Sequence, residues 1–145
     1  MLLHATCVAW GSGKRWRAVL LRGPSGAGKS DLALRLIEAG GRLVADDQTQ
    51  LARIGRTLVA TAPPTLAGMI EVRGIGILKL HRSQLLARAP IVLLVDLVAA
   101  NLIDRMPDPT FETLFEVELP RLPLAPFEAS SVAKLRLALA RIAVA

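Results

Sequence analysis

The stretch at residues 23–30 reads Gly23-Pro24-Ser25-Gly26-Ala27-Gly28-Lys29-Ser30, and it decides the fold class. In such a loop the glycines let successive backbone N–H groups converge on phosphate oxygens, and the positive end of the following helix attracts the same anion. Lys29 would reach the outer phosphates, and the Ser30 hydroxyl would bind the Mg²⁺ ion that bridges them. The pattern therefore predicts that these eight residues bind a nucleotide of the ATP type together with Mg²⁺.

The segments on both sides of this loop predict a strand before it and a helix after it. Residues 18–21 are apolar, as a buried strand requires, and residues 8–10 match them across a turn that contains glycine. Residues 31–39 place apolar side chains along a helical face, and Gly40-Gly41 should end that helix. Strand, loop and helix in this order indicate an α/β fold and disfavour a chance match to a glycine-rich turn.

Two adjacent acids, Asp46 and Asp47, follow the next apolar segment, residues 42–45, which reads as a buried strand. Phosphoryl transfer needs a carboxylate near Mg²⁺ and, when the acceptor is a hydroxyl group, a carboxylate that takes its proton. At a strand end the second residue has already turned into the loop, so we expect both acids to face one cleft. The alternative is a solvated acidic turn without a catalytic role.

Five further segments carry a structural pattern. They are, in chain order, a hairpin at residues 49–61, a strand-like run at 69–80, a fully buried strand at 91–97, a proline-bearing loop at 101–109 and a terminal helix at 130–143. Gly74 and Gly76 inside the second segment indicate a bulge or a close backbone approach. The terminal helix carries cations, but apolar residues occupy most of its circumference, so we expect it to pack on the core.

Composition indicates a single domain, residues 1–145, with a hydrophobic content of 52%. The single cysteine, Cys7, cannot form an internal disulfide, and no secretory signal is evident, so we expect a cytoplasmic location. No apolar stretch approaches the roughly 20 residues of a membrane span. The net charge of +6 favours an anionic partner, but aromatic residues make up only 3%. We therefore expect neither membrane nor nucleic-acid binding.

Three motifs together resemble the HPr kinase/phosphorylase family. They are the phosphate loop, Leu-Val-Ala-Asp-Asp at residues 43–47 and Ile-Glu-Val-Arg-Gly-Ile-Gly-Ile at residues 70–77. The resemblance covers the catalytic domain, from about His4 to the terminal helix, and we expect a short form without the separate N-terminal domain of longer members. It implies a P-loop fold of the HPr kinase and phosphoenolpyruvate carboxykinase type, with a mixed sheet and flanking helices.

The resemblance also implies an activity and a partner. Such enzymes transfer phosphate from ATP to a serine of the small carrier protein HPr, remove it again by phosphorolysis to give pyrophosphate, and assemble as hexamers. Lys29 matches the family's loop lysine, Ser30 matches its Mg²⁺ ligand, and Glu71 matches a glutamate that also holds the metal.

Four other residues are candidates for catalytic groups of that family. His4 falls where the family keeps a catalytic histidine, and Arg105 resembles an arginine that contributes to catalysis. One of Asp46 and Asp47 matches the carboxylate that acts as base in the forward reaction and as acid in reverse, and the sequence leaves open which one. The alternative for His4 is a structural or exposed histidine, and for Arg105 a solvated cation.

The sequence departs from the family in two places. The first hairpin is longer at residues 11–17, and residues 120–131, where longer members carry a Pro-Gly-Arg turn linked to dephosphorylation, contain Pro-Leu-Ala-Pro-Phe-Glu-Ala-Ser-Ser instead. The reverse reaction and the hexamer contacts therefore stay open. The leading hypothesis is an HPr-directed serine kinase, and the alternatives are a small-molecule kinase and a nucleotide-sensing module without catalysis.

Overall fold

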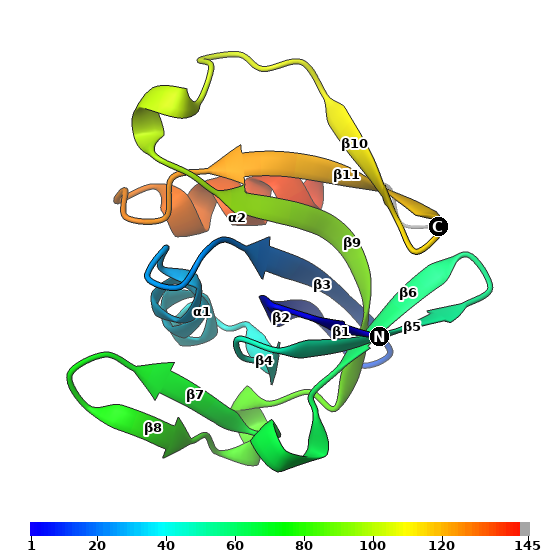
Figure 1. Ribbon diagram of the computed structural model, residues 1–145, viewed down its shortest axis with the longest axis vertical. Helices are drawn as coiled ribbons and strands as arrows, with labels where there is room; N and C mark the ends of the chain where they lie inside the picture. Colours follow the sequence, from blue (N-terminus) through cyan, green and yellow to red (C-terminus); the bar gives the residue numbers. More distant parts are fainter. Residues whose placement is uncertain (143–145) are drawn as a thin grey trace.

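The computed structural model describes residues 1–142 (Figure 1). Its strands are β1 Leu2–Leu3, β2 Ala5–Ser12, β3 Arg15–Arg22, β4 Arg42–Ala45, β5 Thr49–Ile54, β6 Thr57–Thr61, β7 Met69–Val72, β8 Gly76–Lys79, β9 Arg88–Leu97, β10 Thr110–Leu114 and β11 Val117–Leu124. The α-helices are α1 Lys29–Glu38 and α2 Ser131–Ala140, and short 3-10 turns lie at Pro64–Leu66, Arg82–Gln84 and Ala100–Leu102.

Strand β9 organises the main sheet. Within residues 1–142 this sheet has nine strands in the order β1-β5-β6-β9-β3-β2-β4, with β11 also paired to β9 and β10 paired to β11. Strand β9 runs parallel to β3 and β11 and antiparallel to β6. Figure 1 shows the resulting curved sheet, with the β5–β6 hairpin turned away from β3. The expected mixed α/β sheet is confirmed.

Buried side chains form one cluster on each face of this sheet. On β3, Val19 and Leu21 join the cluster under both helices, whereas Ala18 and Leu20 join the cluster that the β5–β6 hairpin covers. This alternation follows from the two-residue period of a strand. Cys7 is free and fully buried in the second cluster, and burial raises the pKa of its thiol, so this group stays protonated.

The predicted helices and hairpins are largely confirmed. Helix α1 buries Leu32, Leu36 and Ile37 on the core face, and the chain leaves it through Gly40 at a φ of 110°. The predicted hairpins appear as β2–β3 and β5–β6, and residues 91–97 lie within β9. Helix α2 ends at Ala140, and residue 143 of the predicted helix lies outside the described residues.

The prediction for residues 69–80 is wrong in one respect. This segment forms two antiparallel strands, β7 and β8, joined by a turn at Gly74, which has a φ of 87°. A Cβ atom at Gly74 or Gly76 would meet no neighbouring atom within 4 Å. These glycines therefore permit a tight turn, and they mark neither a bulge nor a close backbone approach.

Among the described residues, no helix is long and apolar enough to cross a membrane.

Candidate functional site

The phosphate loop connects the carboxyl end of β3 to the first residue of α1. Gly26 and Gly28 adopt φ angles of 84° and 101°, which favour glycine, and they turn the backbone sharply into the helix. A Cβ atom at Gly23 would lie 2.9 Å from the Cβ atom of Ala27, so the loop closes tightly on itself. The loop therefore places its N–H groups at the helix N-terminus, where an anion is stabilised.

Lys29 lies inside the curve of this loop. Its Nζ atom donates hydrogen bonds to the carbonyl oxygens of Gly23, at 2.6 Å, and of Pro24, at 3.2 Å, and the residue is only 5% exposed. A buried ammonium group needs such partners because burial without them is costly. These bonds hold the positive charge where the outer phosphates of a nucleotide would lie.

A cleft of about 470 Å³ lies next to the loop. It is lined by Ser25, Gly26, Gly28, Lys29, Ser30, Asp31, Leu34, Asp47, Glu71, Val72, Arg73 and Phe127. The structure thus brings together residues of the phosphate loop, the carboxyl end of β4 and strand β7. The second acid and the glutamate predicted from sequence, Asp47 and Glu71, both reach this cleft.

Asp46 lies beneath the cleft and is only 9% exposed. Its carboxylate accepts hydrogen bonds from Ser30 Oγ at 2.7 Å, from Thr6 Oγ1 at 3.1 Å and from the backbone N–H of Glu71 at 3.0 Å. These three bonds join the start of α1, strand β2 and strand β7. Asp46 therefore orients the Ser30 hydroxyl and holds three elements of the site together.

Asp47 has a different environment. Its φ of 64° turns the chain out of the strand, and its side chain remains 53% exposed. One carboxylate oxygen lies 2.7 Å from Nε2 of His4, and its backbone N–H donates to Thr6 Oγ1 at 3.0 Å. Asp47 therefore combines access to the cleft with a partner, His4, that fixes its carboxylate. The expectation that both acids face the cleft holds fully for Asp47, whereas Asp46 lies under Ser30.

Arg105 is not brought to this cleft. It belongs to the loop between β9 and β10 and lines a second hollow of about 500 Å³, together with Lys134 and Arg141 of the C-terminal segment. Figure 1 shows this loop beside β11, on the opposite side of the molecule from the β7–β8 hairpin. The catalytic role suggested for Arg105 stays a prediction.

An ion-pair network lies at the strand end that leads into the loop. Arg22 donates to both carboxylate oxygens of Asp96, at 2.8 and 3.1 Å, and to both of Glu112, at 2.6 and 2.9 Å. Arg121 also donates to Asp96 at 2.5 Å. The hydrogen bond from Arg22 holds the pKa of Glu112 below its ordinary value, since it stabilises the charged carboxylate. Arg22 is the last residue before the phosphate loop, so this network connects the end of β3 to β9 and β10.

Thr6 and Phe127 belong to the site but carry no signal that sequence reasoning could use. Thr6 is fully buried and touches both acids, yet it is an isolated hydroxyl residue in an apolar strand. Phe127 lies in the stretch 120–131, which the sequence marks only by its departure from a family pattern. Tertiary contacts between distant segments create both roles.

The oxygen donors at the cleft suit Mg²⁺, which prefers hydroxyl, carboxylate and phosphate oxygens. Ser30 offers a hydroxyl group that Asp46 orients, and Glu71, which lines the same cleft, offers a carboxylate. Among residues 1–142, no group of three His, Cys, Asp or Glu side chains is placed to hold a metal ion. The residues present therefore fit an ion that also binds phosphate oxygens, as Mg²⁺ does in nucleotide sites.

Comparisons with known proteins identify the family. The family model described as HPr Serine kinase C-terminal domain matches residues 13–139. Curated HPr kinase/phosphorylase proteins are similar over part of the chain: that of Limosilactobacillus reuteri is 52% identical over 61 residues, which are 41% of this chain and 19% of the relative. That of Nitrosomonas europaea is 52% identical over 64 residues, 43% of this chain and 20% of the relative. The matched part thus spans about a fifth of these relatives.

A solved structure has the same fold. The HPr(Ser) kinase/phosphatase from Coxiella burnetii superposes with a TM-score of 0.79 at 24% identity, covering 97% of this chain and 93% of that chain. This likeness confirms the expected fold. Because the family model also covers most of the sequence, the chain belongs to the HPr serine kinase C-terminal domain family.

Proposed function

We propose that the protein is an ATP-dependent serine kinase that acts on an HPr-like phosphocarrier protein, with a phosphorylase activity as its reverse reaction. The observation that carries this proposal is the meeting of Lys29, Ser30 and Asp47 in one cleft. A phosphate loop alone fits any nucleotide-binding protein. An exposed carboxylate beside it, fixed by a histidine, is the group that transfer to a hydroxyl acceptor requires.

Each residue of the site has a distinct task in this mechanism. The loop N–H groups and Lys29 hold the phosphates of ATP, and Asp46 accepts the Ser30 O–H, which leaves the lone pairs of Ser30 Oγ for the metal ion. Mg²⁺, held by Ser30 and Glu71, would neutralise charge on the phosphates. These contacts position the γ-phosphate for attack and cost little reorganisation, because the carboxylate and hydroxyl groups are already held in place.

The proton transfer is assigned to Asp47. As the acceptor serine oxygen bonds to the γ-phosphorus and the bond to ADP breaks, the Asp47 carboxylate takes the serine proton. In reverse, the protonated Asp47 returns that proton to the serine oxygen while inorganic phosphate takes the phosphoryl group and becomes pyrophosphate. His4 acts through Asp47, since it holds the carboxylate at 2.7 Å. Asp46 is less suited to be the base because three donors already occupy its oxygens.

The proposed function also implies a partner protein and an assembly. The carrier protein would present its serine at the open side of the cleft, next to Asp47, and copies of the chain would assemble as a homo-oligomer, a hexamer by family resemblance. Cytoplasmic location is part of the proposal and is supported by the free, buried thiol of Cys7.

The test is transfer of labelled γ-phosphate from Mg-ATP to purified HPr, beside the same carrier with its acceptor serine replaced by alanine. We expect label only on the unchanged carrier, and pyrophosphate release when inorganic phosphate is then added. Transfer without release would restrict the protein to the kinase reaction. Equal labelling of both carriers would overturn the assignment, and ATP binding without any transfer would favour a nucleotide-sensing module.

A further inference from the structure

An aromatic ring lies directly on the phosphate loop. Phe127, from the segment between β11 and α2, packs so closely over Gly28 that a Cβ atom there would lie 2.7 Å from its Cζ atom and 3.0 Å from its Cε1 atom. The Phe127 residue nevertheless remains 69% exposed and lines the cleft. The loop therefore needs glycine at residue 28 both for its backbone angle and for this contact.

Hydrogen bonds fix the segment that carries the ring. The guanidinium of Arg35 on α1 donates to the carbonyl oxygen of Pro126. Ser131 Oγ donates to the carbonyl oxygens of Ala125, at 2.6 Å, and Glu128, at 2.9 Å, and it accepts from the Glu128 N–H at 3.1 Å. These bonds bracket Phe127 on both sides. The ring is thus presented to the cleft by a constrained turn.

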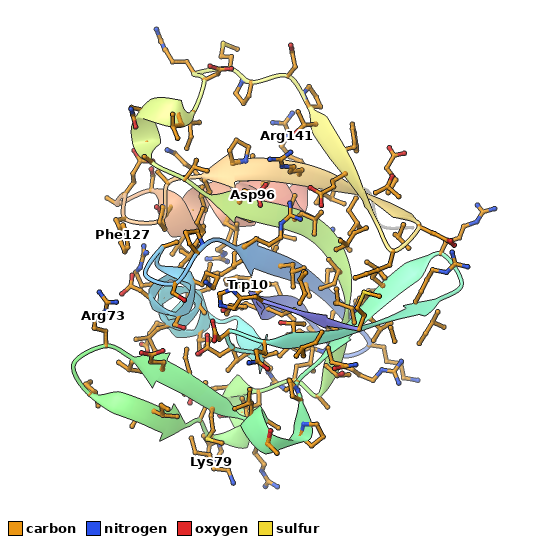
Figure 2. All side chains as sticks on the ribbon, viewed as in Figure 1. Trp10, Arg73, Lys79, Asp96, Phe127 and Arg141 are labelled. Atoms are coloured by element: carbon orange, nitrogen blue, oxygen red, sulfur yellow. The ribbon has the colours of Figure 1, made fainter. Side chains whose placement is uncertain are left out.

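The lining of the cleft contains both polar and apolar side chains. Lys29, Ser30, Asp47 and Glu71 supply charged and hydroxyl groups, whereas Leu34, Val72 and Phe127 supply apolar surface. Figure 2 shows Phe127 and Arg73 on opposite sides of α1. A nucleoside triphosphate likewise combines charged phosphates with a flat aromatic base. Ligand sites commonly pair apolar walls with a few placed polar groups in this way.

We propose that Phe127 is a ligand-contacting residue that stacks on the base of the bound nucleotide while the loop holds its phosphates. This inference rests on the proposed function, because it takes the cleft to bind ATP. It also gives a task to the stretch 120–131, where the sequence lacks the family's Pro-Gly-Arg turn. Because every base has an aromatic face, the ring contributes affinity for the nucleoside rather than choice among bases.

The experiment compares a ligand that has a base with one that has only phosphates. Titration calorimetry with Mg²⁺ present would measure the Kd of ATP and of inorganic tripolyphosphate for the wild type, Phe127→Ala and Phe127→Tyr. We expect Phe127→Ala to raise the Kd of ATP about 5- to 50-fold, the scale of a lost base–aromatic stack. The Kd of tripolyphosphate should change by less than about twofold, and Phe127→Tyr should restore ATP binding.

Phe111→Ala is the matched control, since Phe111 is 59% exposed on β10 and does not line the cleft. It should leave both Kd values unchanged. Equal weakening of ATP and tripolyphosphate by Phe127→Ala, or no weakening of either, would overturn the stacking role while leaving the proposed kinase intact. A wild-type protein that binds tripolyphosphate but not ATP would overturn the proposed function itself, and the stacking role with it.

Discussion

Asp46 and Asp47 are neighbours in sequence, but the fold gives them different chemistry. Asp46 is buried and accepts three hydrogen bonds, one of them from the hydroxyl group of Ser30. Asp47 is half-exposed, and within residues 1–142 its side chain forms a hydrogen bond only with His4. A carboxylate with free lone pairs at the cleft can take a proton, whereas one saturated by donors serves to orient its neighbours.

The two acids should therefore respond differently to replacement by amides. Asp47→Asn should lower kcat by roughly 10²- to 10⁴-fold with little effect on the KM of ATP, because an amide cannot accept the serine proton. Asp46→Asn should weaken Mg-ATP binding and lower the melting temperature, since the amide group disrupts a buried network. Steady-state kinetics and thermal melts measure both effects. The reverse pattern would reassign the base to Asp46.

Lys29 offers a second prediction for a single residue. Lys29→Met should weaken ATP binding roughly 10- to 100-fold, because the site loses a charge-assisted contact to the phosphates. The control is Lys134→Met, which removes an exposed ammonium group that pairs with Glu128 on the surface. Calorimetric titration of both variants with Mg-ATP makes the comparison. Unchanged affinity in Lys29→Met would show that the loop holds the nucleotide without its lysine.

For single residues, the sequence predicts the candidate site but not which contacts each of its residues makes. The loop and the acid pair form contiguous motifs, so they could be predicted. The roles of Asp46 and Asp47 depend on Thr6, His4 and Ser30, which reach them from other elements. Residue identity says nothing about which oxygen atoms are already occupied.

At the scale of strands and loops, the Arg22 side chain connects the two ends of the β9–β10 loop. Arg22 on β3 forms ion pairs with Asp96 near the end of β9 and with Glu112 on β10. Both strand ends that flank the loop of Arg105 therefore bind the same guanidinium group. The pKa of Arg22 is raised above its ordinary value, and the hydrogen bond to Glu112 contributes most to this shift. This network links the proline-bearing loop of Arg105 to the strand that leads into the phosphate loop.

The lowered pKa of Glu112 predicts how stability depends on pH. Because the folded state stabilises the charged carboxylate, this contribution is present above the ordinary pKa of 4.5 and is lost as pH falls through the lower folded value. Glu112→Gln should thus lower the melting temperature at pH 7 by about 1–3 °C, a small effect because the side chain is partly exposed. The difference from the wild type should shrink below pH 4.5.

Melting curves of both proteins between neutral and acidic pH make this test. The control is Glu116→Gln, since Glu116 forms a surface pair with Arg53 and its side chain is 81% exposed. Exposed ion pairs contribute little to stability, so the melting temperature of Glu116→Gln should match that of the wild type at every pH tested. A difference for Glu112→Gln that stays constant down to acidic pH would mean that its carboxylate charge does not stabilise the fold.

Elements with a regular pattern could be predicted, whereas others could not. Helix α1 and the β5–β6 hairpin follow clear periodicity and turn residues, and both are confirmed. We predict no strand at β10 or β11 from the sequence, and Pro120 and Pro123 are unusual residues for the interior of a sheet. Strand β11 nevertheless pairs with β9 and β10, since its apolar residues complete the core. Long-range packing outweighs local preference there.

At the scale of the whole molecule, exposed apolar residues indicate where copies of the chain contact one another. Leu102 is 70% exposed, Met106 91% and Leu137 66%, and they come from the β9–β10 loop and helix α2, which line the second hollow together with β11. Large apolar side chains gathered on a surface often mark an interface between subunits. We expect this surface to be covered in the proposed homo-oligomer.

Light scattering coupled to size-exclusion chromatography measures the assembly directly. The wild type should have a mass that is a multiple of 15.5 kDa, six-fold for the proposed hexamer, and Leu137→Glu should reduce it by placing a charge in the interface. The matched control is Ile77→Glu, the same change at an exposed apolar residue of β8. A monomeric wild type at micromolar concentration would contradict the prediction, and equal effects of both changes would locate the interface elsewhere.

The position of β9 between β3 and β11 has a consequence for how the chain folds. Hairpins such as β2–β3 and β10–β11 join neighbouring segments and can form within about 1–10 μs. The ladder between β3 and β9 joins Leu20 to Leu94, so a long stretch of chain must be ordered before it closes. Non-local pairing of this kind slows folding, typically to milliseconds or longer. Because the phosphate loop begins where β3 ends, we expect the cleft beside it to form only after this slow step.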